Sequence, residues 1–379
     1  MLKSAASNSR LLDTGRKRLM IITPALTGGG AEKVAVNLAA QWADQGHDVS
    51  LVSMRDVSDY DHLIPPAVTV RSLGAKRARF AFLAVRRVIR DVKPHGILSV
   101  VRDGNIITAL SAPFSTETAL VFREANTLHG LYTRSRLWRY VYISAMQLAY
   151  RRAQVVIANS EDTLSALGAA GIAPEKACVI PNPVVPDNYS DFFSAQISHP
   201  WFADSSLEII LSVGRLHPQK DFPTLIRAFS ILAEKRPSAR LVIIGKGEEY
   251  ARLLSLVSEL RLTDKVDFLG FVANPWPYYR CSNVFALSSR WEGFGNVLVE
   301  SMASGTPVVV TDCPGGPRII TGNGKFGRLV PVGDVGGFAA AMEGSLKSPP
   351  APDVIRRRAE EFGVRRVSQL YFEAFGFRG

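Results

Sequence analysis

Short apolar runs alternate with amphipathic segments along nearly the whole chain, and this alternation restricts the possible folds more than any other feature. Each run has roughly four to eight residues and is rich in Val, Ile and Leu, as in strands buried on both faces. Such strands favour a parallel sheet between two layers of helices. The expected strands span residues 18–25, 47–54, 68–73, 95–101, 119–125, 154–160 and 177–182, and then 207–215, 239–247, 265–271, 283–289 and 307–312.

The segments between these runs have apolar residues at helical spacing. A break rich in proline and asparagine, residues 181–188, separates two such series. We therefore predict an α/β chain with two Rossmann-like domains whose parallel sheets face a central cleft. The expected helices span residues 30–46, 79–92, 137–153, 222–235, 297–303 and 354–375. The expected boundaries are a flexible basic leader at 1–18, domains at 19–190 and 191–352, and a C-terminal helix at 353–379 that packs back toward the first domain.

The composition is that of a soluble globular protein, since 47% of the 379 residues are hydrophobic and 21% are charged. No apolar run approaches the ~20 residues that span a bilayer, and the leader lacks the apolar segment of a secretory signal. The widely spaced Cys178, Cys281 and Cys313 argue against a disulfide framework or zinc site and favour the cytoplasm. A net charge of +11 indicates an anionic partner, and no nucleic-acid-reading motif is present.

A triple glycine, Gly28, Gly29 and Gly30, lies between the first strand and the first helix. Glycines there let backbone N–H groups approach a ligand, and a helix N-terminus favours an anion. The spacing differs from the G-x-G-x-x-G of dinucleotide-binding proteins, so we interpret the segment as a phosphate or acceptor loop. The alternative is a turn that only reverses the chain.

Two cations follow the first strand of the second series. Arg215 stands at the strand end, and Lys220 comes shortly after it, before a helix. A guanidinium and an ammonium together can neutralise a pyrophosphate, and the alternative is a pair of solvated surface cations. After the next strand, Gly245 and Gly247 suit a close approach of the backbone to a nucleoside or a phosphate.

The segment 290–310 places Glu292 in a glycine-flanked loop and Glu300 in the helix that follows. We expect Asn296 to cap that helix, which puts Glu300 about one turn inside it and the carboxylates about 10 Å apart along the chain. That separation is too large for one metal ion. Carboxylates accept hydrogen bonds from sugar hydroxyls, so the pair can hold two ends of a folded sugar nucleotide.

These motifs together resemble those of a known family. SVGRL…QKD, EGFGNVLVE, SMASGTPVV and DCPGGP are similar to segments of the family 4 glycosyltransferases, which have the GT-B fold, and the resemblance covers nearly the whole chain from the triple glycine onward. It implies that the domain at 19–190 binds the acceptor and that the domain at 191–352 binds a nucleotide sugar. It also implies a reaction that retains anomeric configuration and needs neither a cofactor nor a metal ion.

The resemblance assigns roles to individual residues. The implied catalytic residues are Arg215 and Lys220, which stabilise the departing diphosphate, and Glu292, which contacts the transferred sugar. Glu300 accepts hydrogen bonds from the ribose hydroxyls. The other implied donor-binding residues are Gly214, Gly245, Gly247, Val272, Phe294, Gly295, Asn296 and Val297.

The acceptor side departs from the family pattern. Members often have a histidine after the fifth strand, whereas His129 lies later than expected, so Arg123, Glu124 and Asn126 compete for that role. Arg318 also stands where members often have glutamate after the GG turn.

Two basic segments rich in aromatic residues, 75–92 and 133–152, favour contact with an anionic membrane surface, and the alternative is ordinary surface helices packed on the sheet. Asp59-Tyr60-Asp61 matches the D-x-D metal element of the other major glycosyltransferase fold, but we interpret it as a solvated turn. The predicted protein transfers a hexose from a UDP- or GDP-sugar to a glycan or lipid-linked acceptor in lipopolysaccharide, capsule or exopolysaccharide synthesis, at the inner face of the cell membrane. The alternatives are a non-catalytic nucleotide-sugar-binding protein and a sugar-nucleotide epimerase on the same fold.

Overall fold

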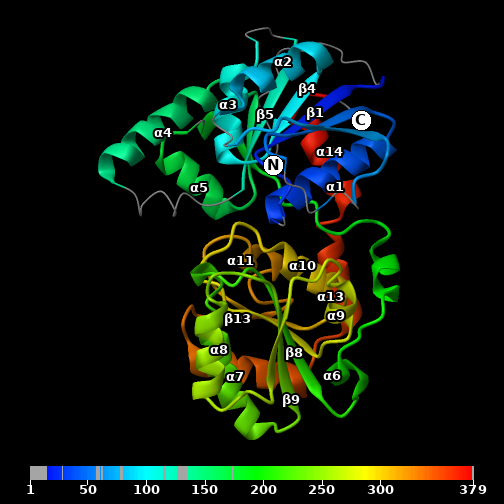
Figure 1. Cartoon of the computed structure of the whole chain (residues 1–379), viewed down its shortest axis with the longest axis vertical. Coiled ribbons are helices and arrows are strands. Elements are labelled where there is room, and N and C mark those ends of the chain that lie inside the picture. Colours follow the sequence, from blue (N-terminus) through cyan, green and yellow to red (C-terminus); the bar gives the residue numbers. More distant parts are fainter. Residues whose placement is uncertain are drawn as a thin grey trace.

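The structure is a computed structural model that describes residues 15–27, 29–56, 60, 63–76, 80–113, 117–125, 135–172 and 174–377. Figure 1 shows two α/β bodies, with the N-terminal elements in the upper one and most later elements in the lower one. Most of the predicted leader lies outside the described residues. The first strand begins at Arg18, the last residue assigned to that leader.

The N-terminal domain contains a parallel sheet with helices on both faces. Its described elements are β1 (Arg18–Thr23), α1 (Gly30–Asp44), β2 (Asp48–Ser53), β3 (Val68–Ser72), α2 (Phe82–Val92), β4 (Gly96–Ser99), α3 (Arg102–Ser111), β5 (Ala119–Glu124), α4 (Arg136–Tyr150), β6 (Val155–Ala158), α5 (Glu161–Ala169) and β7 (Ala177–Val179). The strand order is β3-β2-β1-β4-β5-β6-β7, and the strands pair in parallel. One apolar core lies under α1, and a second lies under α2 to α5.

The C-terminal domain repeats this plan. Its described elements are α6 (Pro200–Ala203), β8 (Glu208–Val213), α7 (Phe222–Lys235), β9 (Ala239–Ile244), α8 (Tyr250–Glu259), β10 (Val266–Gly270), α9 (Trp276–Arg280), β11 (Val284–Leu287), α10 (Asn296–Ala303), β12 (Val308–Thr311), α11 (Pro317–Ile320), β13 (Arg328–Val330), α12 (Val335–Lys347) and α13 (Pro352–Glu360). The strand order is β10-β9-β8-β11-β12-β13, again with parallel pairing. The prediction of two parallel-sheet, Rossmann-like domains is confirmed.

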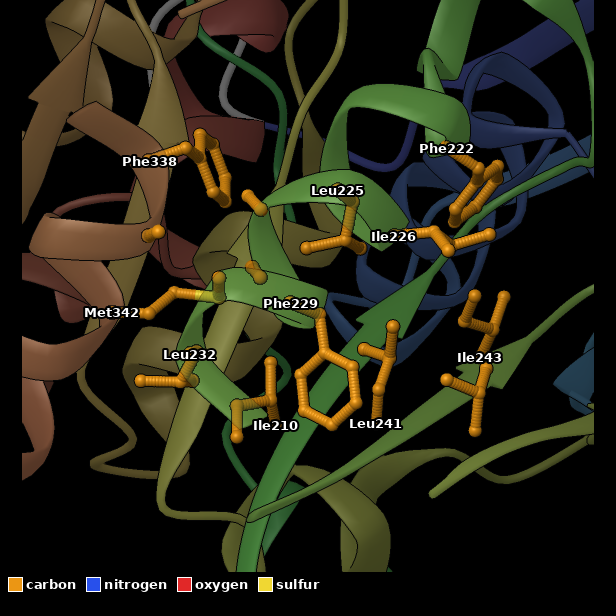
Figure 2. Close-up of a cluster of buried hydrophobic side chains, with 14 of the residues drawn as sticks. Ile210, Phe222, Leu225, Ile226, Phe229, Leu232, Leu241, Ile243, Phe338 and Met342 are labelled. Carbon is orange, nitrogen blue, oxygen red and sulfur yellow. The ribbon is translucent and has the colours of Figure 1, made fainter. Parts of the chain in front are cut away.

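Helix α7 shows how the sequence builds these layers. It begins at Phe222 and ends at Lys235, as predicted. Pro223 suits its first turn, and Pro237 disfavours helical conformation at the residue before it. Figure 2 shows Phe222, Leu225 and Phe229 turned toward the strands, and each is at most 1% exposed. Burying such a side chain contributes about 1.5–3 kcal/mol, so this face fixes the helix on the sheet.

The C-terminal segment corrects one prediction. Residues 354–375 were expected to form a single helix, but α13 ends at Glu360 and α14 spans Val364–Glu373. Between these two helices, residues 361–363 carry the chain from the C-terminal domain back to the N-terminal domain. The backbone there pairs with the earlier linker, since Val184 N donates to Phe362 O (2.9 Å) and Val364 N donates to Val185 O (2.8 Å).

Helix α14 completes the core beneath α1. Phe375 follows it and meets the buried ring of Trp42 edge-on, with ring centroids 5.9 Å apart. Gly96, at the start of β4, makes room for Phe375: a Cβ at Gly96 would lie 2.7 Å from Phe375 Cδ1. Most of the apolar residues of 364–377 therefore belong to the core of the N-terminal domain.

This packing predicts opposite effects for two glycine substitutions. Gly96→Ala should lower the free energy of unfolding by about 1–3 kcal/mol because it overpacks the core. Gly168→Ala lies in helix α5 with open space around the new methyl group and should raise stability by up to about 1 kcal/mol. Calorimetric melting of both variants checks this, and equal melting temperatures would contradict the docking of Phe375.

Candidate functional site

In both sheets, the order of the strands reverses at one point, and open α/β sheets bind ligands there, beyond the carboxyl ends of the strands. In the C-terminal sheet this point lies between β8 and β11. The loop after β8 carries Arg215 and Lys220, and the loop after β11 carries Glu292. In the N-terminal sheet it lies between β1, which precedes the triple glycine, and β4, which precedes Arg102. The predicted loops therefore stand where ligands bind in sheets of this kind.

Lys220 and Glu292 form a close ion pair at this point. Lys220 Nζ lies 2.6 Å from Glu292 Oε1, and the same oxygen accepts a hydrogen bond from Ser289 Oγ. Lys220 ends a short 3-10 helix, and its side chain is largely buried, as is that of Glu292. The alternative of a solvated surface cation is therefore wrong for Lys220, because its ammonium is held in a fixed position.

Arg215 is exposed, and no hydrogen bond or ion pair engages its side chain within the described residues. Its charge nevertheless acts across the cleft on Glu32 of α1. Burial raises the pKa of Glu32, while the charges of Arg123 and Arg215 oppose that rise. The guanidinium donors of Arg215 are therefore available to a ligand.

Two glycines after β9 are required by contact between loops. A Cβ at Gly245 would lie 1.9 Å from Gly214 O, and one at Gly247 would lie 2.2 Å from Leu216 O. The loop backbones are bonded there, since Leu216 N donates to Lys246 O. These glycines fix the loop that carries Arg215, a role that the sequence analysis did not foresee.

Glu300 is buried and accepts from both domains. Tyr279 OH, on α9, donates to its Oε2 at 3.0 Å, and Lys33 Nζ, on α1, lies 2.6 Å from its Oε1. Glu300 also raises the pKa of Tyr279, after burial, which is the larger cause. The predicted ribose carboxylate therefore lies at the interface between the domains.

Asn296 is not the cap of α10. Gly295, with φ of 103°, occupies that position, and Asn296 is the first helical residue. Its side chain instead crosses to the N-terminal domain, where Nδ2 donates to Gly30 O (3.1 Å), and Oδ1 accepts from Asn182 Nδ2 (2.7 Å). Glycine suits this cap because its left-handed backbone carries no Cβ penalty.

The turn at Gly315 and Gly316 packs against the loop before α10. A Cβ at Gly315 would lie 2.1 Å from Glu292 O, and one at Gly316 would lie 1.9 Å from Phe294 O. Gly315 N also donates to Asp162 Oδ2 of the N-terminal domain at 2.6 Å. Phe294 is buried against Phe362, so it supports the loop from its inner side.

Other predicted residues fall around this loop. Val272 and Val297 are partly buried against the same core. Arg318 forms a two-pronged ion pair with Asp312 within its own domain, so its charge is neutralised there.

Two predicted acceptor residues are buried in polar networks. Arg123 is 1% exposed and donates to Tyr371 OH, Val100 O and Asn182 Oδ1. Glu124 pairs with Arg102 at 2.9 Å and accepts from Tyr150 OH. Arg123 therefore ties β5 to α14 and the linker, which favours a structural role for it.

Gly28, Asn126, His129 and most of the D-x-D segment lie outside the described residues. The sequence analysis missed Glu32, Lys33, Arg102 and Asn182. Glu32 and Lys33 could have been noticed as charged residues in the first turn after a glycine loop. Nothing in the sequence pattern distinguishes Asn182 from other linker residues.

The described residues contain neither a cluster of metal ligands nor a membrane-spanning helix. No group of three or more His, Cys, Asp or Glu side chains in them is placed to hold a metal ion. No helix in that part of the chain has the length and apolar character needed to cross a bilayer.

Two family models match consecutive parts of the chain. Residues 28–188 match the model of glycosyltransferase family 4, and residues 194–362 match that of group 1 glycosyl transferases. The division between the two models falls in the linker between the sheets.

Relatives of the chain are named as glycosyltransferases. The chain is 29% identical to N-acetylgalactosamine-N,N'-diacetylbacillosaminyl-diphospho-undecaprenol 4-alpha-N-acetylgalactosaminyltransferase of Campylobacter jejuni, over 91% of this chain and 94% of that protein. It is 37% identical to the lipopolysaccharide core biosynthesis glycosyltransferase LpsE of Rhizobium meliloti, over 41% of this chain and 43% of LpsE.

Solved structures share the fold. Anabaena HepE in complex with UDP-glucose superposes with a TM-score of 0.77 at 22% identity, over 95% of this chain and all of HepE (100%). WaaG, a glycosyltransferase involved in lipopolysaccharide biosynthesis, superposes with a TM-score of 0.70 at 15% identity, over 94% of this chain and 98% of WaaG. With the family models and the Campylobacter relative, these likenesses lead to one conclusion: the chain belongs to the family 4 glycosyltransferases and has the GT-B fold.

Proposed function

We propose that this enzyme transfers a hexose from a UDP- or GDP-sugar, with retention of configuration and without a metal ion, to a glycan or lipid-linked acceptor of a surface polysaccharide. The observation that carries the proposal is the Lys220–Glu292 ion pair beside the strand ends of the C-terminal sheet, with Glu300 buried at the domain interface on the helix that follows. Two cations and two carboxylates suit the diphosphate and the two sugars of such a donor.

The helix termini add to this positive site. The first residues of α1 and α10 contact each other through Gly30 and Asn296, so two helix N-termini converge on the cleft. Each carries a partial positive charge and free N–H groups, which favour an anion between them. A diphosphate placed there is near Arg215 and Lys220, and its ribose lies toward Glu300.

The proposed chemistry needs charge stabilisation above all. The bond from sugar C1 to the phosphate oxygen breaks, and its electron pair stays on the diphosphate. The acceptor oxygen bonds to C1 on the same face, and its proton passes to the departing phosphate oxygen. Arg215 and Lys220 stabilise the growing negative charge. In this role they supply the positive charge that a metal ion supplies to other transferases.

The comparisons support the substrate class. HepE was crystallised with UDP-glucose, and the Campylobacter relative is named for an acceptor on diphospho-undecaprenol. LpsE is named for lipopolysaccharide core synthesis. A UDP-sugar donor and a lipid-linked acceptor fit these relatives and the geometry of the cleft.

We further propose that the N-terminal domain rests on the inner face of the cell membrane. Figure 1 shows α4 extending outward from that domain. Leu137 and Tyr140 on α4 are 74% and 72% exposed, and Leu83 on α2 is 74% exposed. Residues 136–152 include four arginines, at 136, 139, 151 and 152, and no acidic residue. An apolar surface beside arginines is complementary to anionic lipid.

Turnover is tested with a panel of UDP- and GDP-sugars and crude lipid acceptors, measuring released nucleotide and glycosylated lipid. The proposal predicts that one donor releases its nucleotide only when an acceptor is present. Nucleotide release without acceptor points to a hydrolase, a change of the donor sugar points to an epimerase, and tight binding without turnover points to a non-catalytic binder.

Two substitutions should separate chemistry from binding. Arg215→Ala should lower kcat by about 100-fold with little change in KM, because the lost charge stabilises the leaving group. Glu300→Ala should mainly raise KM for the donor, by about tenfold, because ribose hydrogen bonds are lost. Arg227→Ala, on the exposed face of α7, is the control and should match the wild type. Unchanged kinetics in both site variants would place the reaction elsewhere.

Membrane binding is checked by co-sedimentation with lipid vesicles. Leu137→Glu combined with Tyr140→Glu should abolish binding to phosphatidylglycerol vesicles, while neutral phosphatidylcholine vesicles should bind the wild type weakly. Leu254→Glu, at a 42% exposed leucine on α8, is the matched control and should bind like the wild type. Equal loss in both variants would exclude α4 as the contact.

A further inference from the structure

Lys33 and Glu300 join the two domains at the proposed nucleotide site. Lys33 belongs to α1 of the N-terminal domain and Glu300 to α10 of the C-terminal domain, and their charged atoms are 2.6 Å apart. The side chains are 21% and 4% exposed, so the pair is largely shielded from water. Such a contact is held more firmly than a surface ion pair.

The two oxygens of Glu300 face in different directions. Oε2 accepts from Tyr279, which is fully buried in the core of the C-terminal domain. Oε1 accepts from Lys33, which reaches it from the other side of the cleft. A ligand that enters between the domains approaches Glu300 from the side of Lys33. The ammonium therefore stands where ribose hydroxyls would donate.

We propose that Lys33 is a displaceable occupant of the nucleotide site: its ammonium holds Glu300 in the empty enzyme and leaves it when the ribose of the donor binds. This inference rests on the proposed function, since it takes Glu300 as the ribose carboxylate. The buried carboxylate keeps a partner in both states, a cation before binding and hydroxyl donors after it. The exchange weakens ribose binding by the stability of the ion pair and breaks one contact between the domains.

The test compares UDP with 2′,3′-dideoxy-UDP, or the guanosine pair if GDP is the nucleotide that binds. The Kd of the dideoxy nucleotide divided by the Kd of UDP measures what the ribose hydroxyls contribute to binding. Attraction between Lys33 and the phosphates affects both Kd values equally and cancels in this ratio. In Lys33→Met this ratio should rise about fivefold, the equivalent of roughly one hydrogen bond, because Oε1 is then open to ribose. Titration calorimetry supplies the Kd values.

Two controls sharpen this result. Lys347→Met breaks a surface pair with Glu343 on α12 and should leave the ratio unchanged. In a Glu300→Gln background, Lys33→Met should no longer raise the ratio, because no ion pair remains to be removed. Melting curves show whether each variant is folded, and Lys33→Gln replaces the methionine variant if that one is not.

The outcomes separate the two proposals. A ratio that is unchanged or lower in Lys33→Met, with UDP or GDP still bound by the wild type, overturns the role of Lys33 and leaves the proposed function standing. A wild type that binds neither UDP nor GDP overturns both.

Discussion

Two carboxylates buried at one cleft are the constraint on which the rest of this structure depends. A buried carboxylate without a cation costs several kcal/mol, so each one fixes the position of a lysine. Lys220 forms an ion pair with Glu292 within the C-terminal domain, whereas Lys33 of the N-terminal domain forms one with Glu300 of the C-terminal domain. Both residues of the first pair belong to the C-terminal domain, so this part of the site does not depend on the N-terminal domain. The second pair connects the two domains at the site in the empty enzyme.

The same interface contains a continuous line of hydrogen bonds. Arg123 donates to Asn182 at 2.6 Å, Asn182 donates to Asn296 at 2.7 Å, and Asn296 donates to Gly30 O at 3.1 Å. Arg123 is also bonded to Tyr371 of the returning C-terminal helix. The first turn of α10 is thus connected to the core of the N-terminal domain. Movement of one domain against the other must break or shift these bonds.

Much of the fold follows from local patterns, because strands buried on both faces and amphipathic helices have periods that a sequence displays. The three-residue β13 is too short to show such a pattern, and glycines at positions 336, 337 and 344 weaken the helical pattern of α12. The break at residues 361–363 was missed because charged helical spacing continues across it. Gly363, the N-cap of α14, stands at this break in an extended conformation.

The candidate site was predictable where loops at strand ends carry the chemistry. Arg215, Lys220 and Glu292 follow strand ends, and the topology brings strand ends together. The pairing of Lys33 with Glu300 was not predictable, because the two residues meet across a gap of 267 residues in the chain. Asn296 was placed in the wrong role for the same reason: its partners, Gly30 and Asn182, lie in another domain and in the linker.

The proposed function depends on the binding of a nucleoside diphosphate by Arg215, Lys220 and Glu300 of the C-terminal domain. A crystal structure of the enzyme with UDP or GDP tests it most directly. We expect phosphate oxygens within hydrogen-bond distance of Arg215 and Lys220, and ribose hydroxyls that donate hydrogen bonds to Glu300. A nucleotide bound elsewhere, with Arg215 still exposed, Lys220 still paired with Glu292 and Glu300 still paired with Lys33, would contradict it.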